Sequence, residues 1–168
     1  LDESGAIRAL VGGRSFANRE TNLAVPMETG GTGRPAGSTF KPIVLAEFVQ
    51  QGYSLESTYD APPQVTFEPE NDEDDDEPWI VDNFKSADFG RISVIEATER
   101  SVNTAYAQIM RTVTPEKVSA MAQVLGLNSL EPNQSLVLGT GEVQLRDMTA
   151  AYSTFMNKGN YRAPYLIH

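Results

Sequence analysis

The sequence contains no cysteine and only one histidine, His168, which is the last residue. The absence of cysteine excludes a thiol nucleophile and any cysteine-based zinc site. A single histidine at the end of the chain also disfavours a Ser-His-Asp triad within it. Long apolar runs are missing too, because none approaches the roughly 18 residues that a membrane-spanning helix needs.

Basic residues are scarce. The 168 residues include 13 Lys and Arg against 23 Asp and Glu, which gives a net charge of −10. Nucleic-acid binding requires a basic surface that neutralises phosphates, so we expect no nucleic-acid partner. The hydrophobic fraction of 40% is sufficient for a sizeable core, and the length predicts one domain.

The acidic residues concentrate in residues 68–77, a run without an apolar side chain. Like charges repel and nothing in this run can be buried, so it is predicted to be a solvated loop within the domain. An EF-hand calcium loop is excluded, because no register supplies both the glycine at its sixth position and the glutamate at its twelfth. Loose cation binding stays open as the alternative.

Hydrophobic periodicity and turn residues predict a mostly helical chain. Helices are expected at residues 40–51, 91–100, 104–110, 115–125 and 145–156. A short strand is expected at residues 6–11, a strand or loop anchor at 79–81 and an extended segment at 161–167. Residues 53–65 are predicted to be a loop, since they include Pro62-Pro63.

The stretch from Arg34 to Pro42 places Ser38 and Lys41 three positions apart at the start of the first predicted helix. Pro42 fits there because proline is tolerated in the first turn of a helix. Side chains at i and i+3 share one helix face, so the Lys41 amine is expected within reach of the Ser38 hydroxyl. A helix N-terminus also favours the oxyanion that forms on an attacked carbonyl.

This pair predicts a serine nucleophile with a lysine base. Serine is a poor nucleophile without a base, and a lysine can serve if burial or a nearby cation lowers its pKa. On its own, the S-x-x-K pattern also fits a helix-capping serine beside a surface lysine. Nucleotide binding is disfavoured: residues 31–36 match G-x-G-x-x-A, but no strand immediately precedes them and Pro35 disrupts the helix start.

A second pattern, Ser101-Val102-Asn103, favours the catalytic interpretation. Together the two patterns resemble the S-x-x-K and S-D-N motifs of penicillin-binding proteins, and above all the transpeptidase domain of the bifunctional class A enzymes. The similarity includes residues 5–13, 22–24, 138–143 and 148–152, and thus covers nearly the whole chain. The departures are the acidic insertion and Val102, where some relatives have aspartate.

The resemblance implies an α+β fold of the penicillin-binding-protein and serine β-lactamase type, in which helices pack on an antiparallel sheet. Residues 1–168 would form mainly the helical part of this domain, with edge strands. The family's third motif, Lys-Thr/Ser-Gly, is not found, since Leu138 precedes Gly139-Thr140-Gly141. We expect that motif on a strand beyond residue 168, in the same or another chain, and an incomplete active site without it.

The resemblance also implies a serine D,D-transpeptidase that acts on the D-alanyl-D-alanine stem peptides of peptidoglycan. Ser38 would attack the donor peptide and Lys41 would act as its base. Ser101 would pass a proton to the leaving D-alanine, and Asn103 would donate a hydrogen bond to the substrate's amide carbonyl. No metal or organic cofactor is expected. β-Lactams are expected to acylate Ser38, and the expected location is the extracytoplasmic face of the bacterial cytoplasmic membrane.

Three alternatives stay open. A serine β-lactamase shares S-x-x-K but must activate a water for deacylation, and no base for that step is identifiable in the sequence. A catalytically silent or sensor-type penicillin-binding domain would dock peptidoglycan or partner proteins without turnover. The third alternative is a structural half-domain that is inert until its missing strands are present.

Overall fold

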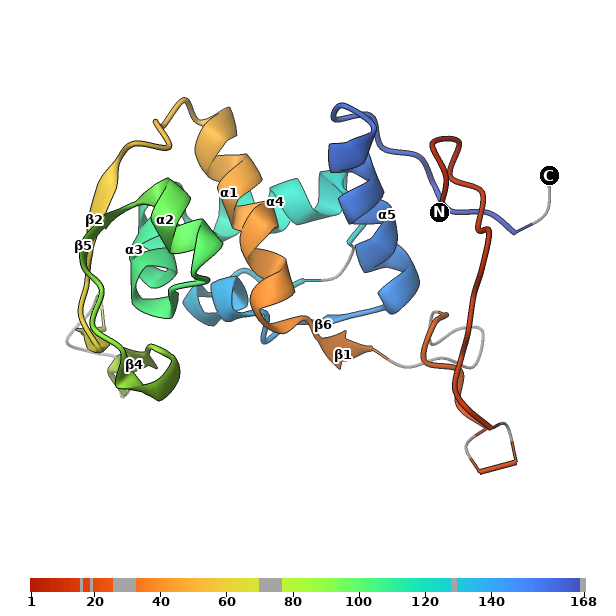
Figure 1. The fold of residues 1–168 in the computed structure, drawn as a ribbon, viewed down its shortest axis with the longest axis horizontal. Coiled ribbons are helices and arrows are strands. Elements are labelled where there is room, and N and C mark those ends of the chain that lie inside the picture. The colour runs from red at the N-terminus through yellow and green to blue at the C-terminus, as the bar shows by residue number, and fades with distance from the viewer. Residues whose placement is uncertain (16, 19, 26–32, 70–76, 128–129, 167–168) are drawn as a thin grey trace.

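The computed structural model describes all residues except 16, 19, 26–32, 70–76, 128–129 and 167–168 (Figure 1). The architecture is α+β, and helices dominate the described part. Its five α-helices are α1 (Lys41–Gln50), α2 (Val94–Glu99), α3 (Asn103–Val113), α4 (Pro115–Val124) and α5 (Leu145–Met156). The described part also has three 3₁₀ segments: η2 (Gly37–Phe40), η3 (Phe84–Ser86) and η4 (Gln134–Leu138).

The strands form three two-stranded antiparallel ladders. β1 (Arg34–Pro35) pairs with β6 (Glu142–Val143), β2 (Thr58–Ala61) with β5 (Gly90–Ser93), and β3 (Gln64–Phe67) with β4 (Trp79–Asp82). The predicted loop at residues 53–65 is therefore wrong, because β2 and the start of β3 lie within it. Pro62-Pro63 only connects these two strands, and each pairs with a strand outside the predicted loop, β2 with β5 and β3 with β4.

Four of the predicted helices are confirmed, at residues 40–51, 104–110, 115–125 and 145–156. The helix predicted at residues 91–100 is right only from Val94 onward, because the preceding residues belong to β5. The change occurs at Ser93, whose extended backbone ends the strand and whose side chain accepts a hydrogen bond from the Glu96 amide (3.2 Å).

The strand predicted at residues 79–81 is confirmed as β4. The strand predicted at residues 6–11 is wrong in extent, because only Ala6 forms a bridge there, a parallel one to Tyr165. That bridge also provides the one strand-like pairing in the described part of the predicted extended segment 161–167. A strand of this kind needs partners along its length, and a single bridge supplies one.

The core forms where α1 packs against α3, α4 and η4. Its largest fully buried side chains include Tyr106, Phe40, Phe48, Ile43 and Ile109, which come from η2, α1 and α3. Burial of each large apolar side chain stabilises the fold by about 1.5–3 kcal/mol. The core therefore fixes α1 and α3, the two helices that begin at the predicted catalytic motifs.

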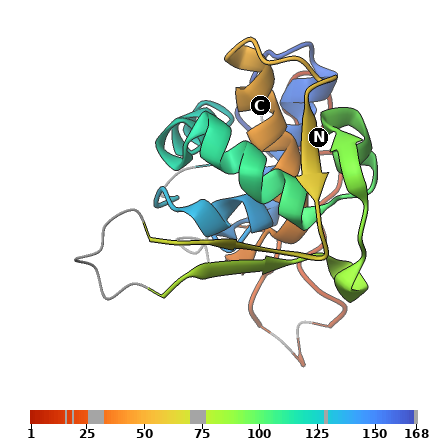
Figure 2. The same ribbon diagram turned by 90° about the vertical axis from the view of Figure 1, so that its left-hand side faces the viewer.

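The β3–β4 hairpin projects from the helical body, as Figure 2 shows from the side. At its outer end the Phe67 and Trp79 rings stack with centroids 5.2 Å apart. Most of the acidic run 68–77, namely residues 70–76, lies outside the described residues, so the solvated loop stays a prediction. Among the helices described, none is long and apolar enough to cross a membrane.

Candidate active site

Ser38 lies on the short 3₁₀ turn η2, which leads directly into α1. Its side chain is exposed, whereas Lys41, the first residue of α1, is only 3% exposed. Pro42 occupies the first turn of α1, as predicted, where its missing N–H costs nothing. An accessible hydroxyl and a buried amine thus lie three residues apart, about one turn of helix.

The Lys41 side chain joins the two motifs. Its Nζ donates hydrogen bonds to the Ser101 carbonyl (2.7 Å), the Ser101 Oγ (3.0 Å) and the Asn103 Oδ1 (2.7 Å). The structure therefore brings Lys41, Ser101 and Asn103 together from segments about 60 residues apart in sequence. The Lys41 backbone amide donates to the Ser38 carbonyl. Within the described residues, no hydrogen bond joins the Ser38 hydroxyl to Nζ, and all three from Nζ go to the second motif.

Burial lowers the pKa of Lys41 from 10.5 to about 8. The desolvation of the ammonium is the cause, and it leaves roughly one lysine in ten neutral at pH 7. The ring of Tyr106 lies 5.4 Å below Nζ, and burial raises the pKa of that phenol, so the neutral ring contributes only its π face. A neutral Lys41 could keep its hydrogen bonds to the two carbonyl oxygens while the Ser101 hydroxyl donates to its lone pair.

Ser101 occupies a position that usually belongs to glycine. Its φ is 54°, in the left-handed region. The Ser101 amide donates to the Thr98 carbonyl and the Val102 amide to the Ala97 carbonyl, which is the Schellman ending of α2. This backbone directs both the carbonyl and the hydroxyl of Ser101 at Lys41. Sequence reasoning did not detect this strain, since no glycine marks the turn.

The next two residues, Val102 and Asn103, have different roles, and the burial of Val102 explains why a valine can stand in the middle of the motif. Val102 is buried in the core, 2% exposed, and contributes no polar atom to the site. Asn103 begins α3, and its Nδ2 donates to the Asp82 carbonyl (2.9 Å) while its Oδ1 accepts from Lys41. An amide nitrogen has two hydrogens, so among the described residues one N–H of Asn103 is left for another acceptor.

The loop after η4 supports the nucleophile turn. The Gly37 amide donates to the Gly139 carbonyl (3.1 Å), and a side-chain carbon on Gly139 would collide with the backbone of Gly37. The Tyr152 hydroxyl from α5 adds a hydrogen bond to the Thr39 carbonyl (2.7 Å). Gly139-Thr140-Gly141 is therefore no substitute for the third motif and supports the Ser38 turn from outside. The glycine pair was the only sequence signal for this contact.

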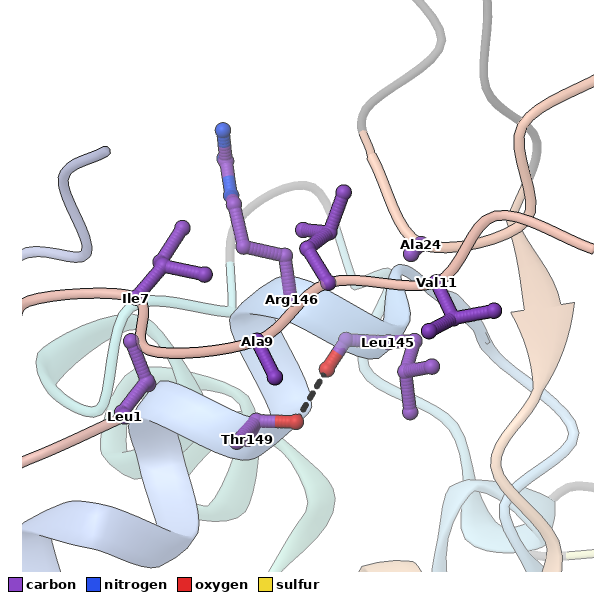
Figure 3. Close-up of a pocket in the computed structure, with 9 residues that line it drawn as sticks. Leu1, Ile7, Ala9, Val11, Ala24, Leu145, Arg146 and Thr149 are labelled. Carbon is purple, nitrogen blue, oxygen red and sulfur yellow. Dashed lines mark hydrogen bonds between the residues drawn. The ribbon is translucent and has the colours of Figure 1, made fainter. Parts of the chain in front are cut away.

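Two cavities in the described part of the chain lie away from this cluster. A small apolar pocket of about 110 Å³ lies where the N-terminal segment crosses the first turns of α5 (Figure 3). Its one hydroxyl, on Thr149, donates back to the Leu145 carbonyl (2.6 Å). A wider apolar groove of about 670 Å³ lies between α1, α4 and α5. Neither of these two is lined by Ser38, Lys41, Ser101 or Asn103, so the candidate site rests on its side-chain contacts and not on these cavities.

The fold and motifs have clear relatives among known proteins. Residues 2–168 match the family profile described as the penicillin binding protein transpeptidase domain. Penicillin-binding protein 1A of Aquifex aeolicus is 34% identical over 165 residues, 98% of this chain and 22% of that protein. Penicillin-binding protein 1A of Pseudomonas aeruginosa is 30% identical over 167 residues, 98% of this chain and 19% of that protein. The chain thus spans about a fifth of these relatives.

Solved structures agree on the fold. Penicillin-binding protein 1A from Haemophilus influenzae superposes with a TM-score of 0.82 at 21% identity, over 94% of this chain and 22% of that one. PonA1 from Mycobacterium tuberculosis superposes with a TM-score of 0.77 at 24% identity, over 96% of this chain and 41% of that one. The resemblance found in the sequence is confirmed, and the chain belongs to the penicillin-binding protein transpeptidase domain family.

Proposed function

We propose that this chain carries the nucleophile, the base and part of the substrate site of a serine D,D-transpeptidase. The observation that supports the proposal most is the buried Lys41, one helical step from Ser38 and hydrogen-bonded to Ser101 and Asn103. A surface lysine beside a capping serine, the ordinary alternative, would be solvated. Burial that lowers the pKa to about 8 suits a general base near neutral pH.

In the first step, neutral Lys41 takes the proton of the Ser38 hydroxyl as Oγ attacks the penultimate D-alanyl carbonyl. The C–N bond to the terminal D-alanine then breaks, and the proton reaches the leaving amine from Lys41 by way of Ser101. The products are an ester on Ser38 and free D-alanine. The hydrogen bond between the Lys41 Nζ and the Ser101 Oγ (3.0 Å) is the route for that proton.

In the second step, an amine of a neighbouring stem peptide attacks the ester. Its C–O bond breaks, an amide cross-link forms, and Ser38 regains a proton through the same lysine. The free N–H of Asn103 would hold the donor's amide carbonyl in both steps. A β-lactam would mimic the donor, and its ring amide would open on Ser38 without releasing a fragment from the site.

The proposal extends to the surroundings of the chain. Acyl-enzyme complexes are described for penicillin-binding protein A of M. tuberculosis with penicillin G, and crosslinking is described for a peptidoglycan synthase complex. By analogy, we expect stem peptides and β-lactams as ligands, and an extracytoplasmic location at the cytoplasmic membrane. The Lys-Thr/Ser-Gly strand stays a prediction, as the partner segment that would complete the site.

A silent or sensor-type domain is the second candidate. Three acceptors around Nζ favour the charged lysine, and among the described residues the Ser38 hydroxyl makes no hydrogen bond to Nζ. Such a site could bind penicillin slowly and lack cross-linking turnover. Release of D-alanine from a synthetic donor peptide separates the two functions, since only a transpeptidase or carboxypeptidase produces it repeatedly.

The test is intact mass spectrometry of the polypeptide as its organism makes it, before and after incubation with benzylpenicillin. We expect one adduct, mapped to Ser38 after proteolysis, and none in Ser38→Ala. Ser135→Ala is a matched control, because Ser135 is a half-buried serine on another 3₁₀ turn, and this variant should still label. Labelling that persists in Ser38→Ala would refute the assignment.

A further inference from the structure

Asn83, the residue after β4, has a buried side chain that is hydrogen-bonded on all sides. It is 3% exposed. Its Nδ2 lies within hydrogen-bonding distance of the Pro62 carbonyl (2.9 Å), the Ala87 carbonyl (3.0 Å) and the Thr104 Oγ1 (3.0 Å). Its Oδ1 accepts from the Thr104 amide (3.0 Å). No motif in the sequence pointed to this residue.

The surroundings permit only one orientation of this amide. If the Asn83 amide were reversed, its oxygen would face two carbonyl oxygens and its nitrogen would face the Thr104 N–H. Both contacts would be repulsive in a buried place, where an unsatisfied polar group costs about 1–3 kcal/mol. The Thr104 hydroxyl itself donates to the Pro62 carbonyl (3.0 Å), which completes the network.

This network connects β4 and η3 to the start of α3. The helix has no side-chain cap of its own, because Val102 occupies its N-cap position. Asn83 supplies the missing cap from a distant strand by accepting the Thr104 N–H. The adjacent Asp82 carbonyl accepts from Asn103. The last residue of the hairpin, Asp82, and the next residue, Asn83, thus hold the first two residues of α3.

We propose that Asn83 is a positioning residue for the acyl-transfer site. It fixes the start of α3 so that Asn103 keeps one N–H on Asp82, presents Oδ1 to Lys41 and leaves its second N–H for the substrate. The inference rests on the proposed function for its effect on rate. The geometric part stands by itself: without Asn83, the side chain of Asn103 loses its fixed orientation.

The experiment uses the polypeptide as its organism makes it, with Asn83→Leu as the principal variant. Leucine has nearly the shape of asparagine and removes all four contacts without adding a charge. We expect the rate constant for acylation by a fluorescent penicillin to fall by about 10- to 100-fold, the loss that a misplaced catalytic group produces. In an Asn103→Ala background the same substitution should have little further effect, because Asn83 acts through Asn103.

A purely structural role gives a different result. In that case Asn83→Leu would slow acylation by the same factor in the presence of Asn103 and in the Asn103→Ala background. Such additivity would overturn the proposal. Val113→Ala, a buried cavity variant at the far end of α3, is the control for general destabilisation and should be additive with Asn103→Ala. If Asn83→Leu does not fold, Thr104→Val replaces it, with Thr104→Ser as the variant that retains the hydroxyl.

A second measurement is independent of catalysis. In protein labelled with ¹⁵N-asparagine, the two side-chain N–H signals of Asn103 should be well separated, because one proton is bound to the Asp82 carbonyl and the other is not. In Asn83→Leu, or in Thr104→Val, the separation between the two signals should become smaller. Unchanged signals would overturn the inference even if penicillin labels Ser38. If the unsubstituted protein does not react with penicillin, the proposed function fails and these signals alone decide the role of Asn83.

Discussion

At the scale of single residues, Lys41 combines a charge with a buried position. Its pKa is about 8 in the folded protein, against 10.5 for an ordinary lysine, and burial is the cause. Between these two pH values the unfolded chain binds more protons than the folded one, so stability from this group rises with pH across that window. Below pH 8 the folded protein bears the full cost of the buried ammonium.

This titration can be measured by comparison with Lys41→Met. The free energy of unfolding of the unsubstituted protein, relative to the variant, should increase by up to about 3 kcal/mol between pH 7.5 and pH 10.5. Urea titrations at several pH values measure the difference, in which the other titrating groups cancel. A difference that does not change with pH would mean that Lys41 titrates as a solvated lysine does.

Ser101 allows a prediction in which stability and activity separate. Glycine at this position would relieve a left-handed backbone that costs a non-glycine residue on the order of 1 kcal/mol. Ser101→Gly should therefore unfold at the same or a higher temperature than the unsubstituted protein, yet acylate more slowly because Lys41 loses the hydroxyl. Ser101→Ala is the control, since it loses the hydroxyl and keeps the strain. If Ser101→Gly is clearly less stable than Ser101→Ala, the serine backbone is not strained.

At the scale of elements, the turn η2 depends on its contact with the loop after η4. Gly139→Ala would place a carbon against the Gly37 backbone, and its φ of 71° disfavours alanine as well. We expect a loss of about 2–3 kcal/mol in stability and slower acylation of Ser38, because the collision displaces the turn that carries it.

A matched control for this substitution exists in the same chain. Gly52 has a similar φ of 85°, but nothing lies within 4 Å of the place where its side chain would be. Gly52→Ala should cost about 1 kcal/mol and leave the acylation rate unchanged. Thermal unfolding and stopped-flow acylation measure both variants. Equal effects of the two substitutions would show that only backbone strain matters and that the contact with Gly37 does not.

The elements also show what the sequence could reveal. The helix at residues 145–156 was predicted with its observed bounds, because apolar residues recur at helical spacing within one segment. The four-residue strands β2 and β3 were missed, since each is defined by a partner elsewhere in the chain. In the site, the two motifs led to Ser38, Lys41, Ser101 and Asn103. The contacts of Asn83 with Thr104 and of Gly139 with Gly37 were not predicted, because they join segments far apart in the sequence.

At the scale of the whole molecule, one face is apolar and uncovered. The groove between α1, α4 and α5 is bordered by Val49, Val124 and Phe155, whose exposed fractions are 50%, 71% and 40%. Met156, 61% exposed, lies at the end of the same helix as Phe155. A contiguous apolar surface of this kind promotes self-association in water.

The 168-residue chain should accordingly bind a hydrophobic dye and form oligomers at high concentration. Val124→Lys should reduce both, because it places a charge on the edge of the groove. Ile80→Lys is the control: Ile80 is 55% exposed, but it lies on the projecting hairpin and away from the groove. Dye fluorescence and sedimentation velocity measure the two effects. A similar reduction by both substitutions would assign self-association to net charge instead of to this face.

The contact between Gly37 and Gly139 also bears on adaptation. The backbone of Gly37 leaves no space for a side chain on Gly139, and the same contact holds the turn that carries Ser38. If β-lactams and stem peptides are the ligands of this site, as proposed, a bacterial population under antibiotic selection could not easily alter the turn at Gly139 without losing the proposed transpeptidase reaction. Resistance would then have to arise from substitutions elsewhere around the site. Inhibitors that contact this turn would face a part of the site in which few substitutions are tolerated.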